Sequence, residues 1–240
     1  MDNAGYVTLS RQSGLLKEMQ TVANNIANMS TTGFRRETTL FAEMIERLPV
    51  EGGSLSMTEA RVRDTRFSQG GLIRTGSPFD MALEGDGFFQ IQTPDGLRLT
   101  RNGSFTRNEN GDLVTAQGHP VLDAGGAPVF MPPSAGKIEI ASDGTVTADG
   151  QPVAAIGIVT VADEGGLRRE GGVMFIAQGD VQAAQGAVLY QGFLEGSNVS
   201  PVAEITRMID VQRAYEAGQA LIEREDERIR SAVRTLGQIR

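Results

Sequence analysis

The sequence contains no cysteine and only one histidine among its 240 residues. Without cysteine the chain can form no disulfide bond, no thiolate nucleophile and no metal site built only from His and Cys. No run approaches the roughly 20 consecutive apolar residues that a membrane helix requires. The first residues also lack the basic, apolar and small-residue order of a cleavable signal. We therefore expect neither cysteine chemistry nor a lipid anchor.

Basic residues are outnumbered by acidic ones, with 22 Lys and Arg against 30 Asp and Glu and a net charge of −8. A protein that neutralises the phosphates of nucleic acid needs a basic face, so we expect no nucleic-acid partner. The chain is 40% apolar and 22% charged. With that composition and length it can bury a sizeable core as one domain or two.

Apolar residues near the N-terminus recur with the spacing of an amphipathic helix, and no glycine or proline interrupts the stretch from Leu15 to Thr32. A sustained seven-residue spacing keeps one apolar stripe facing a partner helix. Gly33 supplies a helix stop, and Phe34 follows it at the start of a connecting arm. The stripe consists of Leu15, Val22 and Met29, with Met19 and Ile26 between them.

A second helix is predicted at the C-terminus. Ser200 can cap exposed backbone amides and Pro201 suits the first helical position. A helix from there to Arg240 would extend about 60 Å, so it needs neighbours along its length. Gly218 and the charged run 223–226 interrupt its apolar face, which favours packing among several helices. Its seven-residue column consists of Met208, Tyr215, Ile222, Ile229 and Leu236.

Between Phe79 and Tyr190 the pattern changes to short apolar runs separated by Asp-Gly and Asn-Gly pairs, which suit tight hairpin turns. The predicted fold class is therefore α+β: long N- and C-terminal helices form a coiled-coil-like domain, and a central all-β domain is inserted between them. The predicted segments are an N-terminal helix (1–33), a connecting arm (34–75), an all-β domain (76–192) and a C-terminal helix (193–240).

Three asparagines, Asn24, Asn25 and Asn28, lie close together near the end of the first helix. Asparagine is a poor helix former because its amide competes for backbone hydrogen bonds. The three lie either on a solvated face or in hydrogen bonds to another helix. On the second interpretation they join the predicted subunit-interface residues, which are Leu15, Met19, Val22, Asn24, Asn25, Ile26, Asn28, Met29, Met208, Tyr215, Ile222, Ile229 and Leu236.

Enzyme chemistry finds little support in the sequence. His119 stands beside Pro120 in an expected turn, with no cysteine available as a partner. Asp80, Glu84 and Asp86 could form a carboxylate pair for sugar hydrolysis, but the glycines among them favour a turn. No GxGxxG motif opens a helix. We expect neither catalysis nor a cofactor.

Four sequence stretches together resemble the axial proteins of the bacterial flagellum, the rod and hook family. They read, in order along the chain, ANNIANMSTTGF (23–34), PFDMALEGDGFFQIQTPDG (78–96), TRNGSFTRNENGDLVTAQGHPVL (100–122) and FLEGSNVSPVAEITRMIDVQRAYE (193–216). The last of them contains Leu194, Glu195, Gly196, Ser197, Asn198 and Val199. The resemblance touches both ends of the chain and the expected β domain.

Within this family the opening MDNAGY, the short length and Gly196 are most similar to the proximal-rod members. The resemblance implies export by the flagellar type III apparatus and assembly in the periplasm with copies of itself and other rod subunits. The terminal helices would build the inner tube of a drive shaft that carries torque to the hook. Two alternatives remain: a distal-rod or hook subunit, and a secreted carbohydrate- or peptidoglycan-binding β domain, for which the Gly-rich hairpins and acidic loops argue.

Overall fold

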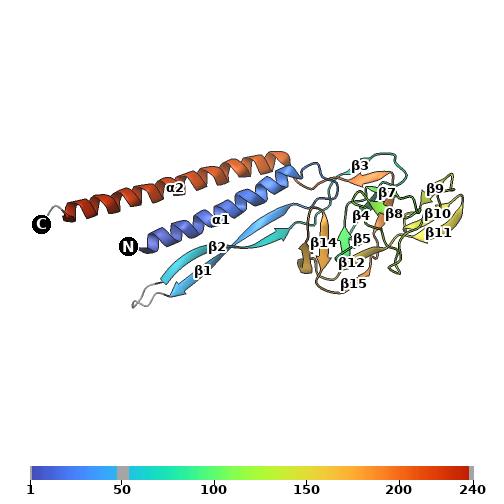
Figure 1. The fold of residues 1–240 in the computed structure, drawn as a ribbon, viewed down its shortest axis with the longest axis horizontal. Helices are drawn as coiled ribbons and strands as arrows, with labels where there is room; N and C mark the ends of the chain where they lie inside the picture. The colour runs from blue at the N-terminus through green and yellow to red at the C-terminus, as the bar shows by residue number, and fades with distance from the viewer. Residues whose placement is uncertain (1, 48–53, 238–240) are drawn as a thin grey trace. The chain divides into compact units, whose positions relative to one another are not determined.

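A computed structural model describes residues 2–47 and 54–237 of the chain (Figure 1). The chain divides into two compact units. The first unit comprises Met1–Ala27, Glu37–Arg66 and Ser200–Arg240, and the second comprises Asn28–Arg36 and Phe67–Val199. Each unit therefore brings together segments that are far apart in the sequence.

The first unit contains both helices and one β hairpin. Its elements are α1 (Asp2–Ala27), β1 (Glu37–Arg47), β2 (Ser54–Thr65) and α2 (Pro201–Gly237). The strands pair antiparallel from Glu37 opposite Thr65 to Arg47 opposite Ser54, and the register shifts once between Leu40 and Phe41. Helix α1 contacts both α2 and the hairpin (Figure 1). Neither described helix combines the length and apolar character needed to cross a membrane.

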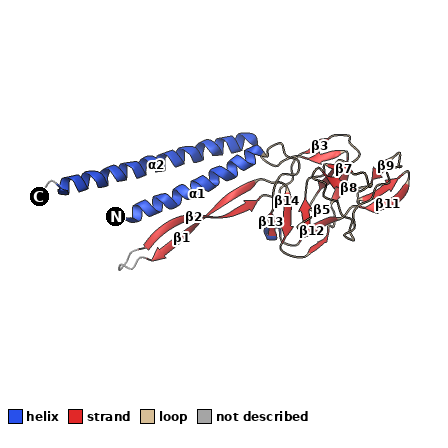
Figure 2. Ribbon diagram, viewed as in Figure 1, coloured by secondary structure: helices blue, strands red, loops and turns tan. Residues whose placement is uncertain are grey.

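The predicted pair of long terminal helices forming a coiled-coil-like domain is wrong. Only the C-terminal helix is long, with 37 residues, whereas α1 has 26 residues and ends at Ala27 (Figure 2). Met29 lies beyond the end of α1 and is 44% exposed, and Ile229 is 48% exposed. The seven-residue columns thus form no continuous seam, and α1 divides its contacts between a helix and a hairpin.

The second unit is mostly β (Figure 2). Its largest sheet has six strands in the order β13-β14-β6-β5-β12-β15, beside a three-stranded sheet β11-β10-β9 and the pairs β16-β4, β17-β3 and β7-β8. The elements are β3 (Leu72–Arg74), β4 (Met81–Glu84), β5 (Phe88–Thr93), β6 (Gly96–Thr100), β7 (Phe105–Arg107), β8 (Leu113–Thr115), β9 (Ile138–Ile140), β10 (Thr145–Ala148), β11 (Gln151–Ala155), β12 (Ile158–Val161), the short 3-10 helix η1 (Glu164–Gly166), β13 (Leu167–Arg169), β14 (Met174–Ala177), β15 (Val181–Ala183), β16 (Val188–Gln191) and β17 (Phe193–Glu195).

Strand β5 lies between two hydrophobic clusters. Successive side chains of a strand point to opposite faces, so Phe88 and Phe89 belong to different clusters. Phe88 packs against Phe175, with ring centroids 6.0 Å apart, and Phe89 packs edge-to-face on Phe105 at 5.3 Å. The two adjacent phenylalanines therefore give the second unit a core on each side of its main sheet.

The hairpin between β10 and β11 has an Asp-Gly pair at its turn. Asp149 and Gly150 have φ angles of 49° and 81°. Positive φ at both central residues characterises the type I′ turn, whose twist matches that of the flanking strands. The Asp-Gly sequence thus fits the connection at which it stands.

Candidate assembly surface and its buried supports

Asn25 connects three segments of the first unit. Its side chain is buried, and its Nδ2 donates to the carbonyl oxygen of Glu37 at 2.8 Å and to Oε2 of Glu204 at 3.1 Å. Its Oδ1 accepts a hydrogen bond from the backbone N of Glu37 at 2.9 Å. This exchange of two bonds is the one a residue makes with its partner on a neighbouring strand. Helix α1, strand β1 and the first turn of α2 are therefore joined at one point.

Two further contacts hold α1 and α2 against each other. The guanidinium Nε of Arg207 donates to Oε1 of the buried Glu18 at 2.6 Å. Nearer the start of α1, Nε2 of Gln12 donates to the carbonyl oxygen of Tyr215 at 2.9 Å. Because the partner numbers on α2 rise as those on α1 fall, the two helices run antiparallel.

The predicted interface residues occupy different environments. Val22 and Asn25 are buried, whereas Met29 and Ile229 are exposed. The side chain of Leu236 lies outside the described residues. The others are half-buried: Leu15, Met19, Asn24, Ile26, Asn28, Met208, Tyr215 and Ile222. Their role in contacts between subunits stays a prediction.

The other two asparagines also have partners within the chain. Nδ2 of Asn24 donates to Oε2 of Glu37 at 3.5 Å. Oδ1 of Asn28 accepts from the hydroxyl of Thr31 at 3.1 Å, in the turn that follows α1. The three asparagines therefore form hydrogen bonds that stabilise the end of α1 and hold β1 against it.

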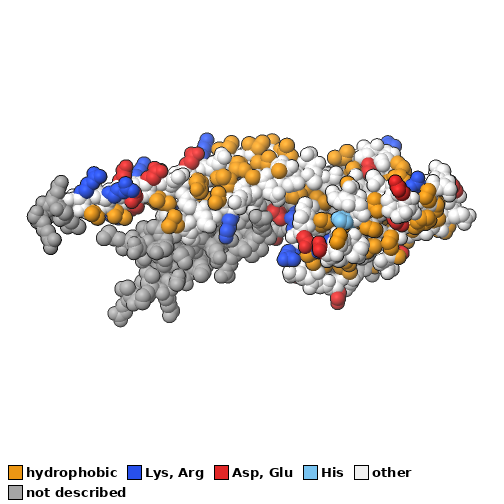
Figure 3. Space-filling model, in the orientation of Figure 1, with side chains coloured by type: hydrophobic (Ala, Val, Ile, Leu, Met, Phe, Trp, Pro, Cys, Tyr) orange, Lys and Arg blue, Asp and Glu red, His pale blue; other side chains and the backbone are white. Residues whose placement is uncertain are grey.

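Exposed apolar side chains line the start of α2, where the sequence columns did not place them. Val202, Ile205 and Ile209 are 76%, 50% and 43% exposed. Hydrophobic side chains gather over this N-terminal part of α2 (Figure 3). Their i, i+3, i+7 spacing puts them on one helix face, and that spacing was the available signal in the sequence.

A buried ion pair organises the second unit. Nη1 of Arg35 lies 2.5 Å from Oε1 of Glu195, and both side chains are 0% exposed. The same carboxylate oxygen accepts a hydrogen bond from the backbone N of Gly70 at 2.8 Å. The carbonyl of Glu195 accepts from the backbone N of Gly33 at 2.7 Å. Three chain segments, around residues 33–35, 70 and 195, meet at this glutamate.

Arg101 is a second arginine beside Glu195. Its Nη1 lies 3.6 Å from the carboxylate, and its Nη2 donates to the carbonyl oxygen of Gly85 at 2.5 Å. Burial lowers the pKa of Arg101 to about 10, although the charge of Glu195 acts in the opposite direction. Sequence reasoning missed both arginines, because charged residues are mostly exposed unless they are paired.

Arg169 and Asn198 hold the segment that follows Gly33. The guanidinium of Arg169 lies 4.6 Å from the ring centroid of the buried Phe34, a cation–π geometry, and its Nη2 donates to the carbonyl oxygen of Arg35 at 2.5 Å. Oδ1 of Asn198 accepts from the backbone N of Arg36 at 2.6 Å, and its Nδ2 donates to the carbonyl oxygen of Ser68 at 2.8 Å. The backbone N of Asn198 also donates to the carbonyl oxygen of Phe34 at 3.3 Å, so the N-terminal and C-terminal motifs are in direct contact.

Gly33 lies well past the end of α1 at Ala27, so it does not cap that helix. Its φ is +69°, and a Cβ added there would lie 2.4 Å from the backbone N of Asn102. Both the left-handed backbone and the close approach require glycine. The residue marks the point where the chain passes tightly over the second unit.

The remaining C-terminal motif residues lie where the chain leaves β17. Leu194 pairs with Ile73 of β3. The backbone N of Gly196 donates to the carbonyl oxygen of Gly71 at 2.8 Å. Oγ of Ser197 accepts from the backbone N of Val199 at 3.3 Å, and Val199 is buried.

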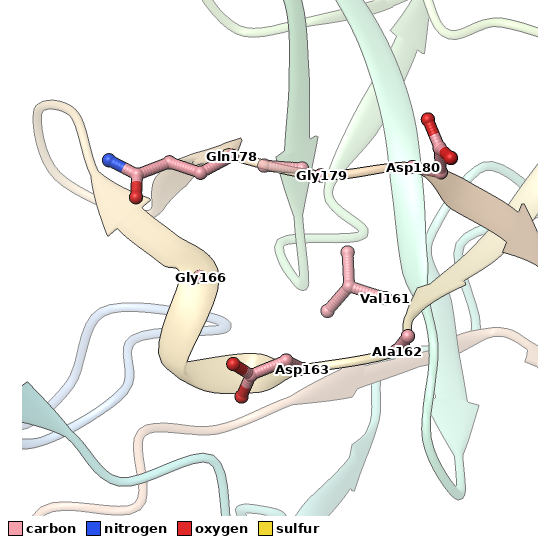
Figure 4. Close-up of a pocket in the computed structure, with 8 residues that line it drawn as sticks. Val161, Ala162, Asp163, Gly166, Gln178, Gly179 and Asp180 are labelled. Carbon is pink, nitrogen blue, oxygen red and sulfur yellow. The ribbon is translucent and has the colours of Figure 1, made fainter.

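No converging catalytic or metal-binding set emerges from the described parts of the chain. Among residues 2–47 and 54–237, no cluster of three or more His, Cys, Asp or Glu side chains is arranged to hold a metal ion. A cavity of about 320 Å³ lies beside η1 in the second unit (Figure 4). Its labelled polar side chains, those of Asp163, Gln178 and Asp180, point in different directions. Asp163 instead accepts a hydrogen bond from the backbone N of Gly165 at 2.8 Å.

Comparison with known proteins assigns these features to a family. Residues 6–35 match the model of flagella basal body rod proteins, residues 82–148 that of the flagellar hook protein FlgE/F/G D1 domain, and residues 190–235 that of the flagellar basal body rod FlgEFG protein C-terminal region. The flagellar basal-body rod protein FlgF of Caulobacter vibrioides is 41% identical, and the match covers 100% of each chain. The chain belongs to the flagellar basal-body rod protein family.

Two further relatives refine the assignment. FlgF of Mesorhizobium japonicum is 38% identical, with 99% of each chain covered. FlgG of Bacillus subtilis is 32% identical over 95% of this chain and 97% of the relative. The FlgF proteins share more identity with this chain than that FlgG does, so the predicted resemblance to a rod protein of this type is confirmed. The rod protein is a structural subunit, and its location is the rod of the flagellar basal body.

Proposed function

We propose that the first unit is the assembly element of this rod subunit and contacts copies of itself and other rod subunits through its helices. The carrying observation is the set of exposed apolar side chains on α2, which a neighbouring subunit would remove from water. Asn25 supports this role from inside the unit, because it fixes α1 and β1 to the start of α2. On this view Val22 and Asn25 shape the surface, and the exposed Ile229 belongs to it. Met29 is also exposed but belongs to the second unit, so it would contact a neighbouring subunit outside this surface.

The buried cluster of the second unit suits a mechanical part. Glu195 and Asn198 hold the segment from Gly33 to Arg36 with hydrogen bonds and an ion pair. The ion pair between Glu195 and Arg35 is shielded from solvent, because both side chains are buried. Removing one partner of such a buried pair is strongly destabilising. A mechanical force on the chain segment that enters this cluster at Gly33 or leaves it at Asn198 would therefore be transmitted to the β core. The proposed task is to transmit torque from the membrane ring towards the distal rod and hook.

We further propose that the chain performs no catalysis and reaches the rod as an unfolded substrate of the flagellar type III export apparatus. A chain without cysteine cannot be trapped by disulfides on the way. Glu84, one of the carboxylates that could suggest chemistry, has a structural partner: its Oε2 accepts a hydrogen bond from the hydroxyl of Tyr190 at 2.7 Å.

The test removes parts of the first unit. Chains lacking residues 1–27 or 211–240 should fail to enter basal bodies, while circular dichroism of the purified chains still shows a folded β unit. The full-length chain, expressed at the same level, is the control. Truncated chains that enter normal rods would contradict the proposal, as would a β unit that unfolds when the helices are removed.

Binding to cell wall separates the proposal from the peptidoglycan-binding alternative. Purified full-length protein should stay in the supernatant when peptidoglycan is pelleted, and it should release no soluble fragments from it. Co-sedimentation that saturates with added protein would favour the alternative. Labelling the subunit in isolated basal bodies then locates it: label at the ring-proximal end of the rod is expected, and label beside the hook would favour a distal subunit.

A further inference from the structure

Residues 28–36 belong to the second unit, although the chain on both sides of them belongs to the first. We call this segment the strap. Helix α1 ends at Ala27 before it, and β1 begins at Glu37 after it. The chain passes between the units at four places, which are the two ends of the strap and the connections after Arg66 and after Val199. The strap therefore accounts for two of the four connections.

The strap is buried at its centre yet is not part of the hydrophobic core. Phe34 and Arg35 are 1% and 0% exposed. Among the described residues, neither hydrophobic cluster of the second unit includes a member of the strap. The strap also contributes no strand to the described sheets of that unit. The core clusters and the sheets of the β unit are therefore complete without it.

Hydrogen bonds hold the strap to the residues that follow β17. The backbone N of Gly33 donates to the carbonyl oxygen of Glu195 at 2.7 Å, and the backbone N of Arg36 donates to Oδ1 of Asn198 at 2.6 Å. The backbone N of Asn198 donates to the carbonyl oxygen of Phe34 at 3.3 Å. These bonds can be broken without exposing either hydrophobic cluster, because the clusters are built from other residues.

Glu195 has partners outside the strap as well as within it. Its Oε1 accepts from Nη1 of Arg35 at 2.5 Å and from the backbone N of Gly70 at 2.8 Å. Its Oε2 has no hydrogen-bond partner in the described part of the chain and lies 3.6 Å from Nη1 of Arg101. An N–H···O bond spans about 2.7–3.2 Å, so a small turn of the carboxylate would join it to Arg101. Glu195 would therefore keep two partners without Arg35.

The two arginines beside Glu195 are held differently. Arg101 also donates to the carbonyl oxygens of Leu83 at 3.3 Å and Gly85 at 2.5 Å, so it is fixed within the β unit. Arg35 uses one donor on Glu195, while its Nε and Nη2 have no hydrogen-bond partner among residues 2–47 and 54–237. A buried cation with unsatisfied donors is costly, and water would satisfy them. The anchor of the strap thus gains hydrogen bonds when it leaves its buried position.

We propose that the strap closes on an already folded β unit as a separate step, and that in the isolated subunit it opens and closes while the β unit stays folded. When the strap is open, Gly70 and Arg101 retain Glu195. The strap is then a free loop of the first unit, and only the connections after Arg66 and after Val199 join the two units. The closed strap therefore adds to the coupling between the units. This device is a property of the single chain and does not depend on the proposed assembly.

Hydrogen exchange of single backbone amides in the full-length chain tests the separate step. The strap probes are the amides of Gly33 and Arg36. The core probes are those of Leu113 and Leu122, which donate to backbone oxygens of the β unit at 2.9 Å. Each rate, corrected for the intrinsic rate of the amide, reports the opening of its own segment. In the unmodified chain the strap amides should exchange at least about tenfold faster than the core amides.

Two arginine variants on the same carboxylate separate the strap from the core. Arg35→Met removes the anchor of the strap. It should speed exchange of the strap amides at least several-fold and change the core amides by less than about twofold. Arg101→Met is the matched control, because it removes the arginine that belongs to the β unit. It should speed exchange of both sets of amides.

Equal rates at the strap and core amides of the unmodified chain would overturn the proposal, because they report one cooperative unit. An Arg35→Met chain that is unfolded would overturn it as well, since the β unit would then depend on the strap. So would an Arg35→Met chain whose core amides are accelerated as much as its strap amides. These measurements use the isolated subunit, so their outcome is independent of the basal-body experiments that test assembly.

Discussion

Asn25 presents its side-chain amide to both backbone groups of Glu37, donating to the carbonyl oxygen at 2.8 Å and accepting from the backbone N at 2.9 Å. The same amide nitrogen also reaches the carboxylate of Glu204 at 3.1 Å. The side chain of Asn25 on α1 thus makes with β1 the two hydrogen bonds that a residue of a neighbouring strand would make. It also donates a hydrogen bond to the start of α2.

Replacing this amide should destabilise the first unit. Asn25→Ala leaves the backbone groups of Glu37 and the carboxylate of Glu204 without that partner, and a buried unsatisfied group costs about 1–3 kcal/mol. We expect a loss of about 2–3 kcal/mol in urea unfolding followed by circular dichroism. Gln20→Ala, at an exposed position of the same helix, is the control and should change little. Equal midpoints for the two variants would contradict the assigned role.

Breaking the buried ion pair should destabilise the second unit. Glu195→Gln leaves the charges of Arg35 and Arg101 buried without their anion, for which the usual cost is about 3–5 kcal/mol. Glu139→Gln is the matched control, because Lys137 and Glu139 form an ion pair at 2.7 Å with both side chains exposed. An exposed pair is worth at most about 1 kcal/mol. Chemical unfolding of both variants should therefore separate them clearly, and similar losses would argue against the buried cluster as a support.

Adding a methyl group at Gly33 should have a larger effect than adding one at a nearby open glycine. Gly33→Ala forces a left-handed backbone on alanine, at about 1–2 kcal/mol, and brings its Cβ to 2.4 Å from the backbone N of Asn102. At Gly71 an added Cβ meets nothing within 4 Å. Unfolding midpoints should fall for Gly33→Ala and stay nearly unchanged for Gly71→Ala. A larger fall in the midpoint for Gly71→Ala than for Gly33→Ala would contradict the close approach of Gly33 to Asn102.

The hydroxyl of Tyr190 should titrate late. Its hydrogen bond to the Glu84 carboxylate raises the pKa of Tyr190 above the ordinary value of 10.0, and the negative charge of Glu84 adds to the effect. The folded state therefore binds this proton more strongly than the unfolded state does, so the contribution to stability is complete below pH 10 and is lost as pH rises through the folded pKa. In ultraviolet titration Glu84→Gln should lower this pKa, and Tyr190→Phe should remove the late transition. A late transition that survives Tyr190→Phe would refute the assignment.

Local patterns in the sequence predicted only part of the organisation of the chain. The Asp149-Gly150 pair lies at a hairpin whose φ angles suit it, and the start of α2 follows Ser200. The prediction of a coiled coil from the seven-residue columns was wrong. Met29 lies past the end of α1, and α1 packs against the hairpin of β1 and β2 as well as against α2. A column reports a helical stripe but not which kind of element covers it.

The buried supports could not be derived from local patterns. The asparagine cluster indicated a need for partners, but the partners of Asn25 lie at Glu37 and Glu204, on other elements. Glu195 stood inside a recognised motif without a physical role, and Arg35 reads as an ordinary surface charge. The two are 160 positions apart in the chain, and only the fold brings them together.

Electron microscopy of basal bodies from a strain that lacks this chain tests the central claim most directly. The account predicts membrane rings without a completed rod or hook, and restoration of both when the full-length chain is expressed. Complete rods and hooks in the absence of the chain would contradict a structural role in the rod.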